Sequence, residues 1–361
     1  MTFIEVAGAK VDTRHYIGGA RVASAETFTN TSPVDGSFLG EIARGGQAEI
    51  DLAVAAANKA FKGWAALGPV GRGELLMKLA ELVEENIETL AQLETMDNGS
   101  LLRSHRRGVM PRVAMNIRFF ADWAINHLGH EKFETRGHTN NISWDPSGVC
   151  ALITPWNAPL MLATWKIGPT LAFGNTAVLK PAEFTPLGAW LLAKCAHEAG
   201  LPPGVFNVVH GFGPDSAGEL LTKHPDVRLI SFTGETTTGK IIMKNASDTL
   251  KRLSMELGGK APNLIFESAD LDRAVEVTMR ASFFNQGEVC LAGSRLLVQR
   301  SVYEPFLERL VKAARSLKVG DPLDPETRMG ALIAEEHLNK VMSYVEIARE
   351  TATILTGGRR P

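Results

Sequence analysis

The chain has 361 residues, 45% of them hydrophobic and 22% charged, and a formal net charge of −2. This composition is typical of a globular protein of two or three domains, and we expect no nucleic-acid partner and no membrane partner. No apolar stretch is long enough to span a membrane, and the first residues lack the apolar run of a signal peptide. The cysteines Cys150, Cys195 and Cys290 cannot all pair and lack metal-ligand spacing, so we expect no metal site and a reducing, cytoplasmic location.

The first part of the chain predicts helices that follow short extended segments. Strands and turns are predicted at residues 16–20 and 30–36. Apolar side chains at helical spacing predict helices over residues 47–64, 72–96 and 103–128. Asn98-Gly99 ends the second of these helices, and Pro111 interrupts the third because its ring removes a backbone donor.

A polar, extended segment follows at residues 130–145. Its apolar residues Ile142 and Trp144 alternate with polar ones, which is typical of a strand. We therefore expect a hairpin arm that stands off the body of the protein.

From Gly148 onward, short apolar runs alternate with helical patterns. Strands are predicted at 149–153, 177–179, 205–209 and 229–232, and helices at 160–171, 186–199, 216–223 and 238–247. This alternation predicts a parallel sheet covered on both faces, which binds ligands beyond the carboxyl ends of its strands. A second β/α set begins near residue 256, with strands at 263–266 and 296–298 and helices at 271–284, 303–317 and 337–350. The predicted fold is therefore α/β.

Polar residues directly follow two of the predicted parallel strands. Thr154-Pro155-Trp156-Asn157 follows the first, and the amide of Asn157 suits a developing oxyanion. Lys180-Pro181-Ala182-Glu183 follows the second. A lysine and a carboxylate at this position can hold the hydroxyls of a ribose, and the carboxylate repels a 2′-phosphate, which favours NAD over NADP. The alternative is a solvated ion pair in a loop.

The stretch from Gly234 to Lys240 resembles a phosphate-binding P-loop. Ile241 stands where that motif needs Ser or Thr for magnesium, so an NTPase is excluded. Backbone donors at the start of the following helix can still face a phosphate. Helix capping by Thr236 or Thr237 is the alternative.

The last two motifs carry a carboxylate and a thiol. Glu256-Leu257-Gly258-Gly259-Lys260 ends a strand at a glycine pair, and its glutamate is a candidate general base. Cys290 follows a polar turn that contains Gly287, and a thiolate there is a candidate nucleophile. The alternative is a buried, unreactive cysteine. Because several such motifs follow predicted parallel strands, we favour one shared site at the sheet edge.

These motifs, in this order, resemble the aldehyde dehydrogenase superfamily over nearly the whole chain. The resemblance implies that Cys290 is the nucleophile, Asn157 the oxyanion donor and Glu256 the base that activates water for thioester hydrolysis. It implies that NAD is the cofactor. The residues that would contact it are Thr154, Pro155, Trp156, Lys180, Ala182, Glu183, Phe232, Thr233, Gly234, Glu235, Thr238, Leu257 and Gly258.

Within the superfamily, the chain is most similar to the 2-hydroxymuconate and 5-carboxymethyl-2-hydroxymuconate semialdehyde dehydrogenases of aromatic degradation. The resemblance therefore implies a small semialdehyde substrate. The residues that would line its tunnel are Arg112, Trp165, Phe284, Val289 and Leu291. Arg112 would pair with a substrate carboxylate, and a surface helix charge is the alternative. A general aldehyde dehydrogenase, a catalytically impaired nucleotide-binding subunit and a thiol esterase or acyltransferase also stay open.

The resemblance divides the chain into an NAD-binding domain (1–125 and 147–257), an oligomerisation arm (126–146) and a catalytic cysteine domain (258–361). It implies a homodimer or homotetramer when the chain is of full length. The chain stops at Pro361 without the family's Glu-x-Phe-Gly-Pro motif, so we expect the catalytic domain to be incomplete. We also expect Glu288, two residues before Cys290, to raise the thiol pKa unless its carboxylate points away.

Overall fold

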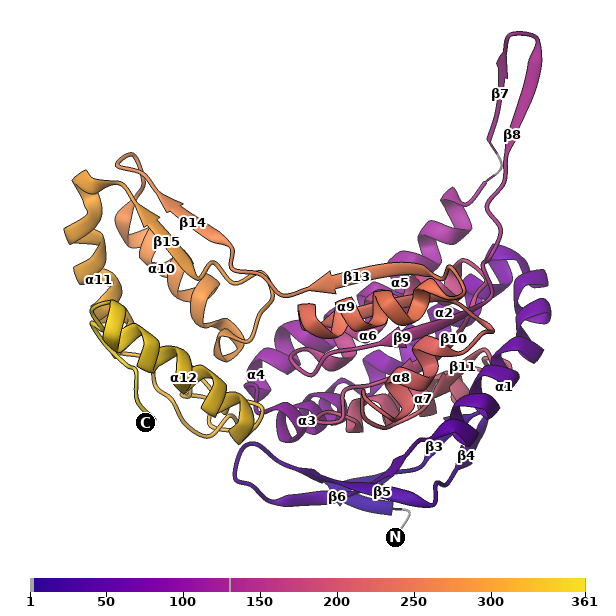
Figure 1. Ribbon diagram of the computed structural model, residues 1–361, viewed down its shortest axis with the longest axis horizontal. Coiled ribbons are helices and arrows are strands. Elements are labelled where there is room, and N and C mark those ends of the chain that lie inside the picture. The colour runs from indigo at the N-terminus through magenta and orange to yellow at the C-terminus, as the bar shows by residue number, and fades with distance from the viewer. Residues whose placement is uncertain (1–2, 130, 361) are drawn as a thin grey trace.

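The computed structural model describes residues 3–129 and 131–360. At the centre of this part of the chain lies a seven-stranded sheet (Figure 1). Its strand order is β13 (Arg252–Leu257), β12 (Val227–Gly234), β9 (Val149–Ile153), β10 (Thr176–Lys180), β11 (Phe206–Val208), β3 (His15–Ile17) and β4 (Ala20–Val22). The strands from β13 to β11 pair in parallel, which confirms the expected α/β class. The antiparallel pair β3–β4 extends the sheet beyond the strands that the sequence predicted for it.

The two faces of this sheet are buried in separate hydrophobic cores. Alternate residues of a strand point to opposite faces, so Cys150 and Leu152 of β9 enter one core while Val149 and Ala151 enter the other. The first core is formed with helices α2 (Gly68–Glu85), α3 (Ile87–Asn98), α5 (Met110–His127), α6 (Pro159–Ala172) and α7 (Leu187–Glu198). The second is formed with α1 (Gln47–Ala66), α8 (Ala217–Lys223) and α9 (Thr236–Ser247). Continuous burial of β9 and β10 explains why these strands are apolar runs.

The predicted helices at 72–96 and 103–128 are both subdivided in the structure. The first is wrong as a single helix because Asn86 leaves the helical conformation (φ −103°, ψ 13°) between α2 and α3. As expected, α3 ends at Gly99, which has a left-handed φ of 77°. The second consists of α4 (Leu102–Ser104), a π-helical turn η1 (His105–Val109) and α5. Pro111 lies in the first turn of α5, directly after the π-helical turn, so the predicted interruption is a change of helix type rather than a break in the helix.

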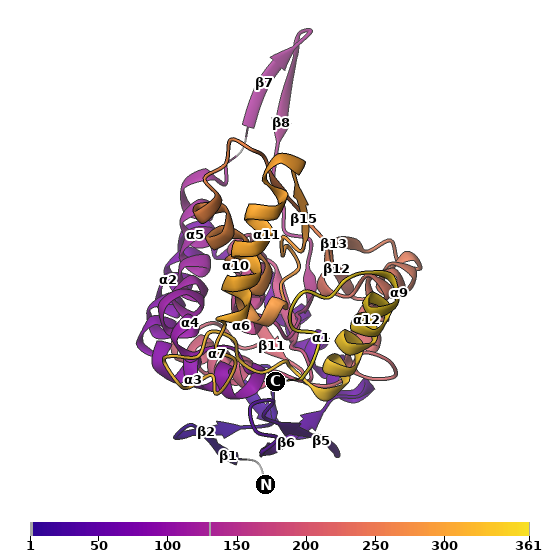
Figure 2. The same cartoon turned by 90° about the vertical axis from the view of Figure 1, so that its left-hand side faces the viewer.

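Several hairpins lie outside the main sheet. The N-terminal ones are β1 (Phe3–Val6) with β2 (Ala9–Asp12), and β5 (Glu26–Thr31) with β6 (Phe38–Arg44). The predicted arm is an antiparallel hairpin of β7 (Glu131–Thr135) and β8 (His138–Ile142), which projects far from the body (Figures 1 and 2). His130, where the predicted arm begins, lies outside the described residues. Phe133 and Trp144 of this arm are at least half exposed.

The C-terminal part forms a smaller α/β unit around the parallel pair β14 (Pro262–Ile265) and β15 (Arg295–Val298). Helices α10 (Leu271–Phe283) and α11 (Tyr303–Arg315) pack on it, and Val275 and Phe306 form its small core with Ile265. The remaining elements are the 3₁₀ turns η2 (Phe284–Gly287) and η3 (Arg300–Val302) and the helix α12 (Glu335–Thr351). Figure 1 shows this unit beside the end of β13. Among the described residues, no helix has the length and apolarity needed to cross a membrane.

Candidate functional site

The predicted motifs end at one edge of the parallel sheet. In the strand register, Ile153 of β9 lies opposite both Lys180 of β10 and Phe232 of β12. On the far side of β12, Thr233 lies opposite Glu256 of β13. Residues that follow these positions, including Thr154, therefore leave the sheet at its carboxyl edge, where parallel sheets bind ligands.

Lys180 and Glu183 form an ion pair at this edge. The ammonium Nζ of Lys180 lies 2.9 Å from the Glu183 carboxylate. The Lys180 side chain is buried and that of Glu183 is partly exposed, so the pair is not the solvated loop pair considered as the alternative. Ala182 between them is also buried. The pair presents a positive and a negative group at the end of β10, beside Thr154, whose N–H donates to the Lys180 carbonyl at 3.2 Å.

The start of α9 offers backbone donors at the same edge. Glu235 is the N-cap of this helix, and no side chain caps it, so capping by Thr236 or Thr237 is wrong. Both threonines and Thr238 lie exposed in the first turn. A side chain at Gly234 would not fit, because its Cβ would lie 2.5 Å from the Phe232 ring. The first amides of α9 are therefore available for an anionic group.

Cys290 is the exposed cysteine of the chain. Cys150 and Cys195 are buried, and this burial raises the pKa of their thiols to about 12 and about 11. They are therefore unreactive at neutral pH, whereas the alternative of a buried Cys290 is wrong. The loop before Cys290 is unusual, because Asn285 (φ 51°) and Gln286 (φ 58°) both take left-handed conformations.

Asn157 joins the cysteine loop to the sheet edge through its side-chain amide and its backbone carbonyl. Its side-chain amide donates to the Glu288 carbonyl at 2.7 Å. Its own carbonyl accepts from the Asn285 side chain at 2.8 Å. Two motifs that are more than a hundred residues apart in the sequence are thus held together. One of these hydrogen bonds is made by Glu288, two residues before Cys290. The second proton of the Asn157 amide is available for another acceptor.

The carboxyl group of Glu288 is buried and contacts residues 333 and 337. It accepts a hydrogen bond from the Ile333 N–H at 3.2 Å and lies 3.6 Å from the ring nitrogen Nε2 of His337. Burial raises the pKa of Glu288 to about 8, so this group is largely uncharged at neutral pH.

Sequence reasoning missed Lys166, a buried lysine near Glu256. Its ammonium donates to the Ser231 hydroxyl at 3.2 Å. Burial lowers the pKa of Lys166 to about 8, and the negative charge of Glu256 opposes this shift. Glu256 itself is exposed near the end of the edge strand β13, with Leu257 and Gly258 after it. The signal in the sequence was a lone lysine inside an otherwise apolar helix. A buried charge needs a partner, so such a lysine indicates a polar or charged group nearby.

The predicted cofactor motifs are also contacted by α12, which the sequence analysis left without a role. The rings of Trp156 and His337 meet edge to face, with their centroids 5.2 Å apart. Lys340 pairs with Glu235 at 3.0 Å. In the sequence, only the exposed, polar face of the predicted helix hinted at these contacts. The contacts themselves could not be predicted, because they depend on how α12 packs.

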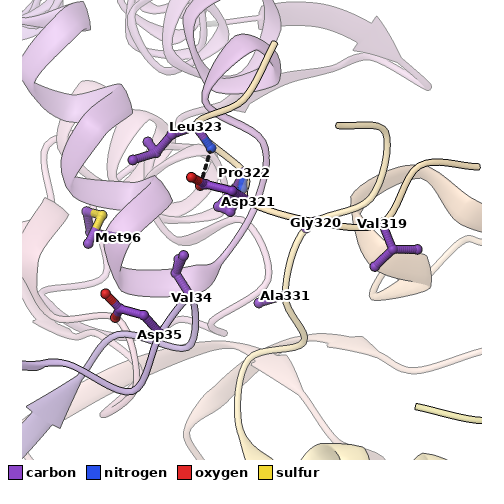
Figure 3. Close-up of a pocket in the computed structure, with 10 residues that line it drawn as sticks. Val34, Asp35, Met96, Val319, Gly320, Asp321, Pro322, Leu323 and Ala331 are labelled. Carbon is purple, nitrogen blue, oxygen red and sulfur yellow. Dashed lines mark hydrogen bonds between the residues drawn. The ribbon is translucent and has the colours of Figure 1, made fainter. Parts of the chain in front are cut away.

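The predicted substrate residues are less closely assembled. Trp165, Phe284 and Leu291 are large apolar side chains that are 44%, 48% and 71% exposed. Val289 is half-buried, and Arg112 is exposed on α5. In the described residues, no hydrogen bond or ion pair joins any of these side chains to Cys290. A hollow of about 530 Å³ lies elsewhere, between α3 and the segment 319–331 (Figure 3), and no predicted site residue lines it.

Comparison with known proteins identifies the family. The profile of the aldehyde dehydrogenase family matches residues 21–361. The chain belongs to the aldehyde dehydrogenase family. Its relatives include the 5-carboxymethyl-2-hydroxymuconate semialdehyde dehydrogenase of Escherichia coli, which is 45% identical over 95% of this chain and 73% of that protein. The 2-hydroxymuconic semialdehyde dehydrogenase of Pseudomonas sp. strain CF600 is 44% identical over 96% of this chain and 73% of that protein.

Solved structures of family members share this fold. PnpE, a protein from Pseudomonas sp. WBC-3, has been crystallised in complex with nicotinamide adenine dinucleotide. That structure superposes with a TM-score of 0.94 at 44% identity and covers 97% of this chain and 72% of PnpE. Because the predicted motifs lie at the carboxyl edge of the parallel sheet, this edge is the candidate active site of the protein.

Proposed function

We propose that the protein oxidises an aldehyde to a carboxylic acid with NAD, through a thiohemiacetal and a thioester on Cys290. The observation that carries this proposal is the pair of hydrogen bonds that join Asn157 to the loop of the exposed Cys290. It supports the proposal because it links the Asn157 amide to a carbonyl two residues before Cys290, at an edge where parallel sheets bind ligands.

The residues at this edge fit a dinucleotide. Lys180 and Glu183 suit the two hydroxyls of the adenosine ribose, and the uncapped start of α9 after Gly234 suits the pyrophosphate. The remaining contacts are those proposed from the family motifs, from Thr154 to Trp156 and from Phe232 to Thr238. When bound, NAD supplies the acceptor for the hydride that leaves the thiohemiacetal carbon.

The chain's own residues then carry the acyl chemistry. The Cys290 thiolate attacks the aldehyde carbon, and the oxyanion that forms accepts from the Asn157 amide and from the Cys290 N–H. After oxidation, Glu256 removes a proton from water, which attacks the thioester carbon and releases the acid and the Cys290 thiolate. Lys166 is a positive group near Glu256, so Glu256 does not lie among negative charges alone.

We assign residues 1–125 and 147–257 to an NAD-binding domain and 258–361 to the catalytic domain. Residues 126–146 form an arm for assembly into homodimers or homotetramers. The exposed Phe133, Ile142 and Trp144 support this assignment, because an isolated two-stranded hairpin with apolar side chains is marginal in water.

The substrate that we propose is a semialdehyde with a carboxylate, as in the muconic semialdehydes named for the relatives. Arg112 would pair with that carboxylate, since an arginine binds a carboxylate through two parallel hydrogen bonds. Trp165, Phe284, Val289 and Leu291 would line the apolar part of the substrate path.

The Arg112→Ala variant tests the substrate class. We expect it to lower kcat/KM for carboxylated semialdehydes by about tenfold or more, the value of one charged hydrogen-bonded pair, and to spare small neutral aldehydes. Arg309→Ala, which removes an exposed arginine on the distant α11, is the control. Equal losses on both substrate classes would favour a general aldehyde dehydrogenase.

A panel of aldehydes tests the activity itself, with absorbance of reduced cofactor as the readout. NADH formation that requires Cys290 supports the proposal. If no aldehyde gives NADH while the thiol still reacts with iodoacetamide, the proposal fails. Ester hydrolysis without NAD would instead favour a thiol esterase.

A further inference from the structure

We propose that Ser100 is a positioning residue that holds the cysteine loop and, through it, the amide of Asn157. This inference rests on the proposed function of Cys290 and Asn157. Ser100 follows the end of α3 and is only 2% exposed, and no motif of the sequence includes it.

The Ser100 hydroxyl is joined to two consecutive residues of the cysteine loop. It donates to the side-chain oxygen of Asn285 at 2.6 Å. It accepts from the side-chain amide of Gln286 at 3.2 Å. A hydroxyl can donate once and accept from other groups, so both roles are filled by the loop.

Both of these loop residues have a left-handed backbone conformation. Asn285 and Gln286 have φ values of 51° and 58°, a region that side chains with a Cβ rarely occupy. Such conformations persist where the surroundings over-determine them, and they concentrate at functional sites. Ser100 is the shared partner of both side chains, so we assign to it the stabilisation of this turn.

The same turn leads directly to the reactive groups. Asn285 uses its oxygen for Ser100 and its amide for the carbonyl of Asn157, at 2.8 Å. Asn157 in turn donates to the carbonyl of Glu288, two residues before Cys290. A continuous chain of hydrogen bonds therefore runs from Ser100 to the proposed oxyanion donor, and fixing that donor in place is what electrostatic catalysis requires.

The position of Ser100 is itself fixed by hydrogen bonds and close packing. Its N–H donates to the Asn98 side chain at 2.9 Å. The preceding Gly99 accepts from the Ala331 N–H at 3.2 Å, and a Cβ at Gly99 would lie 2.8 Å from the Ala331 carbonyl oxygen. Figure 3 shows the segment that carries Ala331 beside the end of α3. The serine thus links a packed turn to the strained loop.

The test compares Ser100→Ala with Ser32→Ala. Ser32 is a matched control because it is 1% exposed, donates to the Met96 carbonyl at 2.8 Å and accepts from the Val34 N–H at 3.3 Å. Each variant therefore loses a buried hydroxyl at the same end of α3. We expect Ser100→Ala alone to speed amide hydrogen exchange across residues 284–290 by about tenfold or more, the effect of one lost buried hydrogen bond.

We also expect Ser100→Ala to lower kcat by about tenfold while the KM for NAD stays within about twofold of the wild-type value. Equal exchange rates in the two variants, or an equal fall of kcat in Ser32→Ala, would overturn the proposal. If Ser100→Ala does not fold, Asn285→Gly relieves the backbone strain but removes the same link, and it should show the same change in kcat. If the wild-type protein oxidises no aldehyde, the proposed function fails, while hydrogen exchange still tests the role of Ser100.

Discussion

Glu288→Gln should change how the stability of the protein depends on pH. The wild-type carboxyl group is buried and has a pKa of about 8, raised from 4.5 by burial. The folded protein therefore holds this proton up to about pH 8, whereas the unfolded chain releases it near pH 4.5. The stability that Glu288 contributes is thus fully present below pH 4.5 and is lost as the pH rises through 8.

The size of the effect follows from the shift. Each pKa unit corresponds to about 1.4 kcal/mol, so the full shift corresponds to about 5 kcal/mol as an upper bound. Glutamine keeps the shape of the protonated acid and does not titrate. The variant and the wild type should therefore be about equally stable near pH 4.5, and the variant should be the more stable one near pH 9.

The assay is urea unfolding of both proteins, followed by fluorescence at several pH values. His337, whose ring lies 3.6 Å from the Glu288 carboxylate, is present in both proteins, so comparing the two isolates the glutamate. Burial also lowers the pKa of His337, which favours the neutral form of its ring. A stability difference that does not change with pH would refute the reasoning that Glu288 is protonated in the folded protein.

Two further predictions concern His105 and Lys180. Burial lowers the pKa of His105 from 6.5 to about 4, so its contribution to stability is present above pH 6.5 and is lost as the pH falls through 4. Relative to His105→Gln, the wild type should lose about 3 kcal/mol of unfolding free energy as the pH falls over this window. If urea unfolding shows the same difference in free energy between the two proteins at every pH, the prediction is contradicted. Lys180→Met should raise the KM for NAD about tenfold with little change in kcat, because it removes a charged ribose contact. Initial rates measure the KM for NAD, and Lys194→Met, which breaks an exposed ion pair with Glu198, is the control. Equal KM values in the two variants would count against the contact between Lys180 and the ribose.

The sheet edge could be predicted because each buried strand is recognisable from a short stretch of sequence. A run such as residues 149–153 identifies a buried parallel strand, and parallel strands necessarily bring the residues after them to one edge. Residues Thr154, Lys180 and Glu256 could therefore be grouped before their positions were known. The exposure of Cys290 could not be decided in the same way, since it depends on what packs over its loop.

The contacts that the sequence did not predict join distant segments. Glu288 meets an N–H that lies 45 residues further along the chain, and Ser100 meets Asn285 over 185 residues. No periodicity within either segment carries information about such a pairing. The break at Asn86 was missed for another reason, because apolar spacing continues through both α2 and α3 and only the backbone of one residue departs from the helix.

Trapping of the acyl-enzyme tests the central claim most directly. In Glu256→Gln, hydrolysis of the thioester should be slowed while its formation continues. Mass spectrometry of this variant after incubation with NAD and an aldehyde should find the acyl group on Cys290, and omission of NAD should abolish this thioester. An acyl group on another residue, equal labelling without NAD, or no labelling under conditions in which the wild type forms NADH would contradict the account.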